Sequence, residues 1–245
     1  MERSFNRLAD ELRNIKVTTN FTHNANGSVL VEFGETKVIC TVMIDSHVPG
    51  WLKGGSSGWL TAEYGMLPGC SKIRIGREKH LSSGRTKEIQ RLIGRAMRAV
   101  VDLSQLPEKT VLIDCDVIQA DGGTRTTSIN GSMIALSLAM IDLKNKGIID
   151  KSPIRDFVAA ISVGLVGGDV CLDLDYKEDS AAGVDMNVAM LSSGKFIEIQ
   201  GTAEHEAFGR QQLNNMLEFA EKGIREIIDI QKSFVKDDLA WLLEH

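Results

Sequence analysis

The sequence predicts an α/β fold in which β-strands precede a helix, an order that occurs twice along the chain. Three observations lead to this prediction. Short runs rich in β-branched residues fill the first part of the chain, two long segments carry apolar residues at helical spacing, and further strands lead into one last long helix. A length of 245 residues accommodates one large domain or two fused halves. Because no linker separates independent units, we predict a single domain over residues 1–245.

The first predicted strands run from Ser28 to Phe33 and from Lys37 to Ile44, on either side of the hairpin signal Gly34-Glu35-Thr36. A glycine-rich stretch from Pro49 to Gly69 follows them. This stretch is too long for a simple turn, so we predict a functional loop there.

Apolar residues between Arg85 and Leu103 recur at the spacing of a helix that faces the core, which places Arg91, Arg95 and Arg98 on the outward side. Alternation and helical spacing predict the later elements in the same way. They are a strand from Thr110 to Ala120, a helix from Arg125 to Lys146, strands from Phe157 to Val166, Val170 to Tyr176, Met186 to Leu191 and Phe196 to Gln200, and a last helix from Arg210 to Lys232.

The composition is that of a soluble globular protein, with 43% hydrophobic and 25% charged residues. No apolar run approaches the roughly 20 residues that span a bilayer, and the amino terminus lacks the apolar core of a secretory signal. We therefore expect no membrane partner and a cytoplasmic location.

Four widely spaced cysteines form no Cys-x-x-Cys pair, which argues against a structural zinc site and a disulfide framework. We expect reduced thiols at Cys40, Cys70, Cys115 and Cys171. The terminal Leu243-Glu244-His245 is typical of a purification-tag remnant, so it takes no part in the site predictions.

Charge is distributed unevenly along the chain. The net charge of −5 by itself argues against a nucleic-acid partner. Between Gly69 and Arg98, however, nine basic residues stand against two acidic ones, a net +7. Composition alone leaves two explanations open: a solvated helix face, or a surface that binds nucleic-acid phosphates. The basic residues are Lys72, Arg74, Arg77, Lys79, Arg85, Lys87, Arg91, Arg95 and Arg98.

A glycine turn with the sequence DGGTRTTS, at 121–128, stands between a predicted strand and a predicted helix. Glycine lets the backbone approach an anion, and the free N–H groups at a helix start attract negative charge. Arg125 adds a bidentate donor, so Gly123, Thr124 and Arg125 form a candidate phosphate site. The alternative is a tight turn with an ordinary helix start.

A second glycine turn, Ser82-Ser83-Gly84-Arg85-Thr86, opens the basic helix. Two arginines at two helix starts would bracket one inorganic phosphate. The alternative is an ordinary cap made by Ser82 or Ser83, with Arg85 in solvent.

Six acidic residues lie between Asp169 and Asp185. Asp179 and Asp185 flank a bend of small residues, and a chain reversal there would bring their carboxylates together at a site for Mg²⁺, which prefers oxygen ligands. Turn capping is the alternative for this pair. We expect Asp173 and Asp175 to be solvated on a strand face, whereas Asp114 and Asp116 are candidate third participants or an outward strand face.

Several strings resemble the bacterial RNase PH family, and the resemblance extends from about Leu12 to Gln231. They are LTAEYGMLP at 60–68, GRTKEIQRLI at 84–93, DCDVIQADGGTR at 114–125, EDSAA at 178–182, DMNV at 185–188 and QGTAE at 200–204.

The resemblance implies a two-layer α/β (α+β) sandwich of two ββα-type halves with mixed sheets, assembled as a homohexamer of three dimers. It implies a phosphorolytic 3′→5′ exoribonuclease that trims tRNA precursors and other RNA 3′ ends. The family's phosphate-binding residues match Arg85, Gly123, Thr124 and Arg125, its catalytic and Mg²⁺-associated pair matches Asp179 and Asp185, and its RNA-guiding region matches Lys72, Arg74 and Arg77.

Three positions depart from the family pattern. Gly69 and Gly50 stand where relatives usually carry arginines, and a lost phosphate contact should weaken RNA binding rather than the chemistry. The amino-terminal Arg3-Ser4-Phe5-Asn6-Arg7 lacks the glycine usual before the second arginine.

Two other functions stay open. A hydrolytic two-metal ribonuclease would use the acidic cluster and leave the arginine turns incidental. A catalytically silent RNA-binding ring subunit would be expected to lack the phosphate-site arginines or the aspartates, and all four are present. Asp185 has two candidate roles, as a metal ligand or as the general acid for the leaving oxygen.

Overall fold

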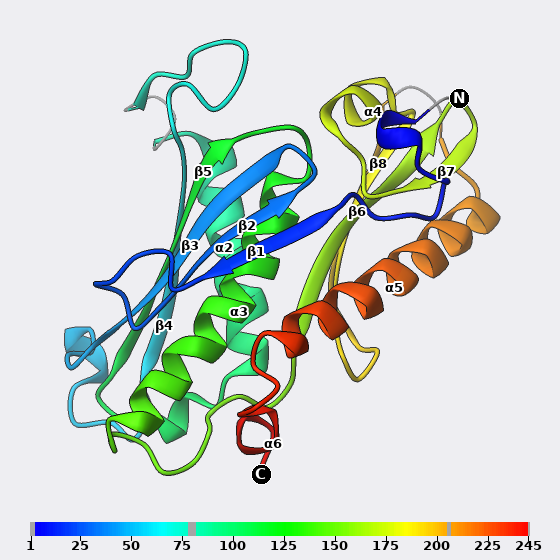
Figure 1. Ribbon diagram of the computed structural model, residues 1–245. Coiled ribbons are helices and arrows are strands. Elements are labelled where there is room, and N and C mark those ends of the chain that lie inside the picture. Colours follow the sequence, from blue (N-terminus) through cyan, green and yellow to red (C-terminus); the bar gives the residue numbers. More distant parts are fainter. Residues whose placement is uncertain (1–2, 78–81, 205–206, 245) are drawn as a thin grey trace.

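The computed structural model describes residues 3–77, 82–204 and 207–244. Figure 1 shows two β-sheets, with helix α3 packed between them and helix α5 against the second sheet. Residues of both sheets belong to one continuous hydrophobic core. The single-domain organisation stays a prediction.

The first sheet has five strands in the order β1-β2-β3-β5-β4. All neighbours are antiparallel except β4 and β5, which run parallel. One face of this sheet packs against the helices and the other is left open, as the alternating burial along the strands indicates. The strands are Ile15–Thr19 (β1), Gly27–Phe33 (β2), Thr36–Asp45 (β3), Trp59–Met66 (β4) and Thr110–Gln119 (β5).

Two helices cover the inner face of the first sheet. Helix α2, Gly84–Val100, packs its apolar stripe on β4 and exposes its arginines, as predicted. Helix α3, Thr124–Asn145, contacts β2 and β3 on one side and β6 on the other, so it is buried nearly all round rather than along one stripe. Close approach requires glycine: a Cβ on Gly27 would lie 2.0 Å from the carbonyl oxygen of Ala135.

The second sheet is wholly antiparallel, in the order β7-β6-β8-β9. Helix α5, Arg210–Ser233, packs against β6 and β7. The remaining elements are Val158–Val166 (β6), Asp169–Leu172 (β7), Tyr176–Ala181 (α4), Val184–Leu191 (β8), Phe196–Ala203 (β9), Leu239–Leu242 (α6) and short 3-10 turns at Ser4–Asn6 (η1), Gly50–Leu52 (η2) and Leu103–Gln105 (η3).

The sandwich of sheets and packed helices is confirmed, with four corrections. The expected loop from Pro49 to Gly69 is wrong in its second half, where β4 runs parallel to β5. The strand expected from Val170 to Tyr176 ends at Leu172, because Asp173 adopts φ +53° and the chain turns into α4. Strand β1 was not predicted, and only the first of the two sheets is mixed.

The four cysteines are unpaired and buried, as expected for thiols. Within the described ranges no helix combines the length and apolar character that crossing a bilayer requires. The cytoplasmic location stays a prediction. Leu243 packs against the core, whereas His245 and Lys79 lie outside the described residues.

Candidate active site

The turn between β5 and α3 is shaped for an anion. Gly122 and Gly123 have φ of +77° and +65°, a left-handed conformation that glycine adopts at little cost. Gly123 is the N-cap of α3 and no side chain caps the helix, so the first-turn N–H groups carry partial positive charge. A Cβ on Gly122 would lie 2.5 Å from the carbonyl carbon of Asp175, so this turn packs directly against the start of α4.

Thr124 and Arg125 are anchored on the first turn of α3. The Thr124 hydroxyl lies 2.9 Å from the buried Tyr64 hydroxyl on β4. Arg125 is only 13% exposed and its Nη1 donates to Gln200 on β9 at 2.8 Å and to Glu88 on α2 at 3.4 Å. Tyr64, Glu88 and Gln200 were not predicted as site residues, although each lies in a string that resembles the family.

Arg85 stands at the start of α2, where Ser83 is the N-cap and accepts from the backbone N–H of Thr86 at 3.1 Å. Ser83 therefore caps the helix, as one prediction held, and Arg85 stands at the same helix start, where the phosphate-site prediction placed it. Arg85 is exposed, yet its charge and that of Arg125 both lower the pKa values of Tyr64, Asp179 and Asp185, which burial raises. The structure thus brings the two arginine turns together.

The predicted acidic pair also converges. Asp179 lies on α4 and Asp185 on β8, joined by the small-residue bend. Burial raises the pKa of Asp185 to about 6, the Asp179 carboxylate adds to the rise, and Arg125 and Arg85 oppose it. Burial likewise raises the pKa of Asp179, and Glu204 at the end of β9 adds to that rise. Two carboxylates and two arginines therefore occupy one small region.

Asp114 and Asp116 belong to a different surface. They lie on the open face of the first sheet, where Asp114 pairs in register with Glu63. Burial raises the pKa of each, and Glu63 adds to both rises, whereas Arg77 lowers the pKa of Asp116. The further carboxylate that raises the pKa values of Asp179 and Asp185 is that of Glu204.

The expectation that Asp173 and Asp175 are solvated is wrong. Asp173 is 0% exposed and Asp175 is 2% exposed. Asp173 forms a buried ion pair with Arg13, with an Nη2 to Oδ1 distance of 2.7 Å. Asp175 caps α4 by accepting from the backbone N–H of Glu178 at 2.8 Å. Their partners come from the amino-terminal segment and the next helix turn.

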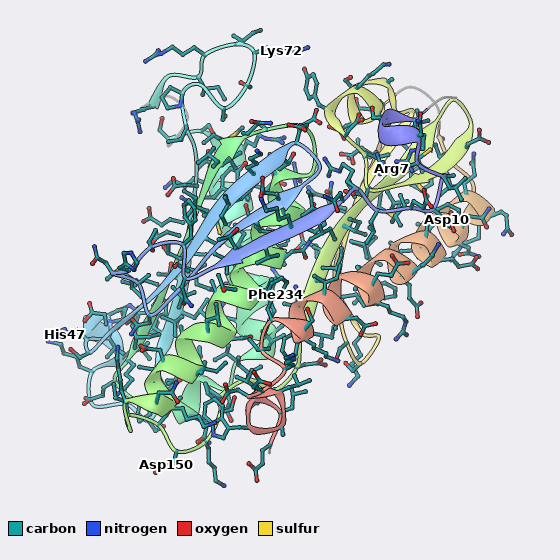
Figure 2. All side chains as sticks on the ribbon, in the orientation of Figure 1. Arg7, Asp10, His47, Lys72, Asp150 and Phe234 are labelled. Carbon is teal, nitrogen blue, oxygen red and sulfur yellow. The ribbon has the colours of Figure 1, made fainter. Side chains whose placement is uncertain are left out.

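The amino-terminal segment lies along β7 and α4, with Arg7 beside them in Figure 2. Arg3 and Arg7 both donate to the buried carboxylate of Glu178, at 2.8 Å and 3.1 Å. Asn6 adopts φ +52°, the left-handed conformation that the family's glycine would favour and that asparagine tolerates. Asn6 therefore permits this left-handed turn of the backbone although it is not glycine.

Lys72, Arg74 and Arg77 are exposed on the long loop between β4 and α2. This loop extends from the same end of the molecule as the acidic pair and α4, and Lys72 marks it in Figure 2. Its base is fixed by the Ala120 N–H, which donates to the Cys70 carbonyl at 2.8 Å. Three exposed cations on one loop are suited to binding a polyanion.

Within the described part of the chain, no three carboxylate, imidazole or thiol groups are close enough to form a complete metal site. Mg²⁺ does not require one, because it is usually held by one or two carboxylates together with water and substrate phosphate. Asp179 and Asp185 fit that donor set.

Comparisons with known proteins agree along nearly the whole chain. Family models described as 3′ exoribonuclease family, domain 1 and domain 2, match residues 11–142 and 156–223. Ribonuclease PH of Bdellovibrio bacteriovorus is 54% identical over 94% of this chain and 95% of the relative. Ribonuclease PH of Syntrophomonas wolfei is 53% identical over 96% of this chain and 99% of the relative.

Solved structures share the fold. A chain of the Archaeoglobus fulgidus exosome with RNA bound to the active site superposes with a TM-score of 0.79 at 21% identity, covering 94% of this chain and 92% of that one. Rice Rrp46 superposes with a TM-score of 0.76 at 21% identity, covering 96% and 100%.

Replacing Asp185 with asparagine should stabilise the folded protein at neutral pH. Its pKa of about 6 exceeds the ordinary 3.8, so the ionised carboxylate opposes folding above pH 6, and the effect disappears below about pH 4. We expect Asp185→Asn to raise the free energy of unfolding by on the order of 1–3 kcal/mol at pH 7.5 and by much less at pH 4.5.

Urea denaturation at both pH values, without phosphate or Mg²⁺, measures this difference. Asp150→Asn, at an exposed position, serves as the control and should show no such pH dependence. A loss of stability at pH 7.5 in Asp185→Asn would contradict the assignment of an unfavourable buried charge.

Proposed function

This chain belongs to the 3′ exoribonuclease family, and on that premise we propose that it trims the 3′ ends of tRNA precursors by phosphorolysis. The observation that carries the proposal is the convergence of Arg85 and Arg125 on Asp179 and Asp185. A hydrolytic enzyme uses water as its nucleophile and needs no site for free orthophosphate, whereas a phosphorolytic enzyme must bind that anion, and two arginines at glycine turns suit this task.

In the reaction, an oxygen of inorganic phosphate attacks the phosphorus of the last phosphodiester. The bond from that phosphorus to the 3′ oxygen of the preceding nucleotide breaks, and this oxygen takes up a proton. The products are a nucleoside 5′-diphosphate and an RNA shorter by one nucleotide. Because one phosphate linkage replaces another, the reaction also runs in reverse.

The attacking phosphate and the RNA end are both anions, so the site must offset their repulsion. The N–H groups of Gly123 and Thr124 and the guanidinium groups of Arg85 and Arg125 would hold the phosphate. Gln200 and Glu88 hold Arg125 in place before phosphate arrives. Lys72, Arg74 and Arg77 would attract the RNA backbone towards this end of the molecule.

Asp179 and Asp185 would hold Mg²⁺, which supplies positive charge at the reacting phosphoryl group. With a pKa of about 6, Asp185 is also suited to protonate the leaving 3′ oxygen. The direction of the pH dependence separates the two roles. A metal ligand must be ionised, so activity would be lost as the pH falls, whereas a general acid must be protonated, so activity would be lost as the pH rises.

A factorial degradation assay tests the proposal. The protein is incubated with a 3′-extended tRNA, with and without phosphate and with and without a chelator, and the released nucleotides are separated by chromatography. We expect nucleoside 5′-diphosphates only when both phosphate and Mg²⁺ are present. Nucleoside monophosphates in phosphate-free buffer would indicate the hydrolytic alternative, and no release under any condition would indicate a silent subunit.

Arg125→Ala should raise the phosphate KM by on the order of tenfold to a hundredfold, because a charge-assisted hydrogen bond is lost. RNA affinity should change by less than about twofold. Arg225→Ala, which removes an arginine paired with Glu221 on the outer surface of α5, is the matched control and should leave both values unchanged. An equal loss of phosphate and RNA affinity in Arg125→Ala would mean that Arg125 has a structural role.

We also expect a homohexamer built from three dimers. The open face of the first sheet carries apolar side chains that such contacts would bury, including Leu30, Ile39, Met43 and Leu112. Sedimentation equilibrium at micromolar concentration should give six times the 26.8 kDa of one chain. A monomeric mass at that concentration would exclude the ring.

A further inference from the structure

Arg13 is a buried cation that directly contacts the phosphate turn. Its side chain is 0% exposed. Its Nε and Nη2 atoms donate to the two carboxylate oxygens of Asp173, at 3.0 Å and 2.7 Å, in a bidentate pair. Its Nη1 atom donates to the carbonyl oxygen of Asp121 at 2.8 Å and, more weakly, to that of Gly122 at 3.5 Å. The Arg13 guanidinium therefore connects Asp173, which follows β7, to the 121–123 turn.

The partner of Arg13 is held rigidly. Asp173 adopts φ +53°, which is uncommon for a residue other than glycine and is sustained only by its surroundings. Its backbone N–H donates to Ser162 on β6 at 2.7 Å, and its Oδ2 also accepts from the Arg13 backbone N–H at 2.8 Å. Arg13 is therefore paired with a carboxylate whose backbone is bonded to the second sheet.

The turn is held from the same inner side by Thr36. The Thr36 hydroxyl donates to the Gly122 carbonyl at 2.6 Å and accepts from the Asp121 N–H at 2.9 Å. In a trans peptide the carbonyl and the following N–H point in opposite directions. Holding the Asp121 and Gly122 carbonyls inward therefore turns the following N–H groups away from Arg13 and Thr36, and the Gly123 N–H is one of the groups that would hold the phosphate.

We propose that Arg13 is a positioning residue for the phosphate site: it orients the peptide groups of the 121–123 turn so that the Gly123 N–H, at the start of α3, faces orthophosphate. The inference rests on the proposed function, because it concerns the same phosphate. Arg13 does not contact phosphate itself. Asp173 lies two residues before Asp175, which caps α4, the helix that carries Asp179. The Arg13–Asp173 ion pair therefore connects the 121–123 turn to the segment that leads into the acidic pair.

Arg13→Lys tests the proposal, because lysine retains the positive charge but lacks the planar fork that reaches Asp173 and the turn together. We expect the Kd for inorganic phosphate, measured by calorimetry, and the phosphate KM to rise by about tenfold. RNA affinity should stay within about twofold of wild type. A structural defect would instead weaken phosphate and RNA binding alike.

A double variant covers the case in which the lone lysine disturbs folding. Arg13→Met with Asp173→Asn removes both buried charges at nearly constant volume, and asparagine tolerates the left-handed backbone. It should fold and show the same loss of phosphate affinity. Lys222→Met, which removes the exposed ion pair with Asp10 of the amino-terminal segment, is the control and should bind phosphate like wild type.

The outcomes separate the two proposals. Wild-type protein that binds no phosphate and shows no phosphate-dependent activity would refute the proposed function. Wild-type protein that binds phosphate, together with a folded Arg13 variant of unchanged phosphate affinity or of equally weakened RNA affinity, would overturn only the role of Arg13.

Discussion

The geometry of the site depends on the burial of helix α3 between two sheets. Strands β2 and β3 pack on one side of this helix and β6 on the other. Its polar side chains are used inside the core: Asn130 donates to the Ala160 carbonyl at 2.9 Å and accepts from the Ala160 N–H at 2.8 Å. A helix held on both sides cannot shift without breaking the core, so its first turn is a fixed point from which Gly123 and Arg125 can be aimed.

Like charges lie close together beside the first turn of α3. Burial raises the pKa values of Asp179 and Asp185, the Asp179 carboxylate raises that of Asp185 further, and two arginines only partly offset these rises. A region chosen for stability alone would separate these groups. Such a grouping of charges is typical of a binding site. Anionic phosphate would pair with the arginines, and a divalent cation would pair with the carboxylates.

Much of the fold was predictable because the periodicities are strong. The apolar stripe of α2 and the alternation in β5 place both elements within a few residues. Strand β4 was missed because six glycines surround and interrupt a short apolar alternation, and its pairing with β5 comes from a distant part of the chain. The glycine turn at 121–123 and the proximity of Asp179 to Asp185 were predictable because each depends on residues that are close in sequence, whereas their roles stay predictions.

Asp173 was misread for a physical reason. A carboxylate in a run of acids looks solvated unless its counter-ion is visible, and the counter-ion Arg13 lies 160 residues away. The same holds for Glu178, whose partners Arg3 and Arg7 come from the other end of the chain. Ion pairs of such sequence separation carry no local signal.

The contacts of Arg125 also bear on how selectively the proposed phosphate site would bind an anion. A free arginine side chain loses considerable rotational entropy when it closes on a ligand. Here Gln200 and Glu88, on β9 and α2, restrain the guanidinium during folding. A tetrahedral anion bound at the proposed site would therefore meet a donor whose direction is already set, which would favour groups that match this direction over chloride or a carboxylate of different shape.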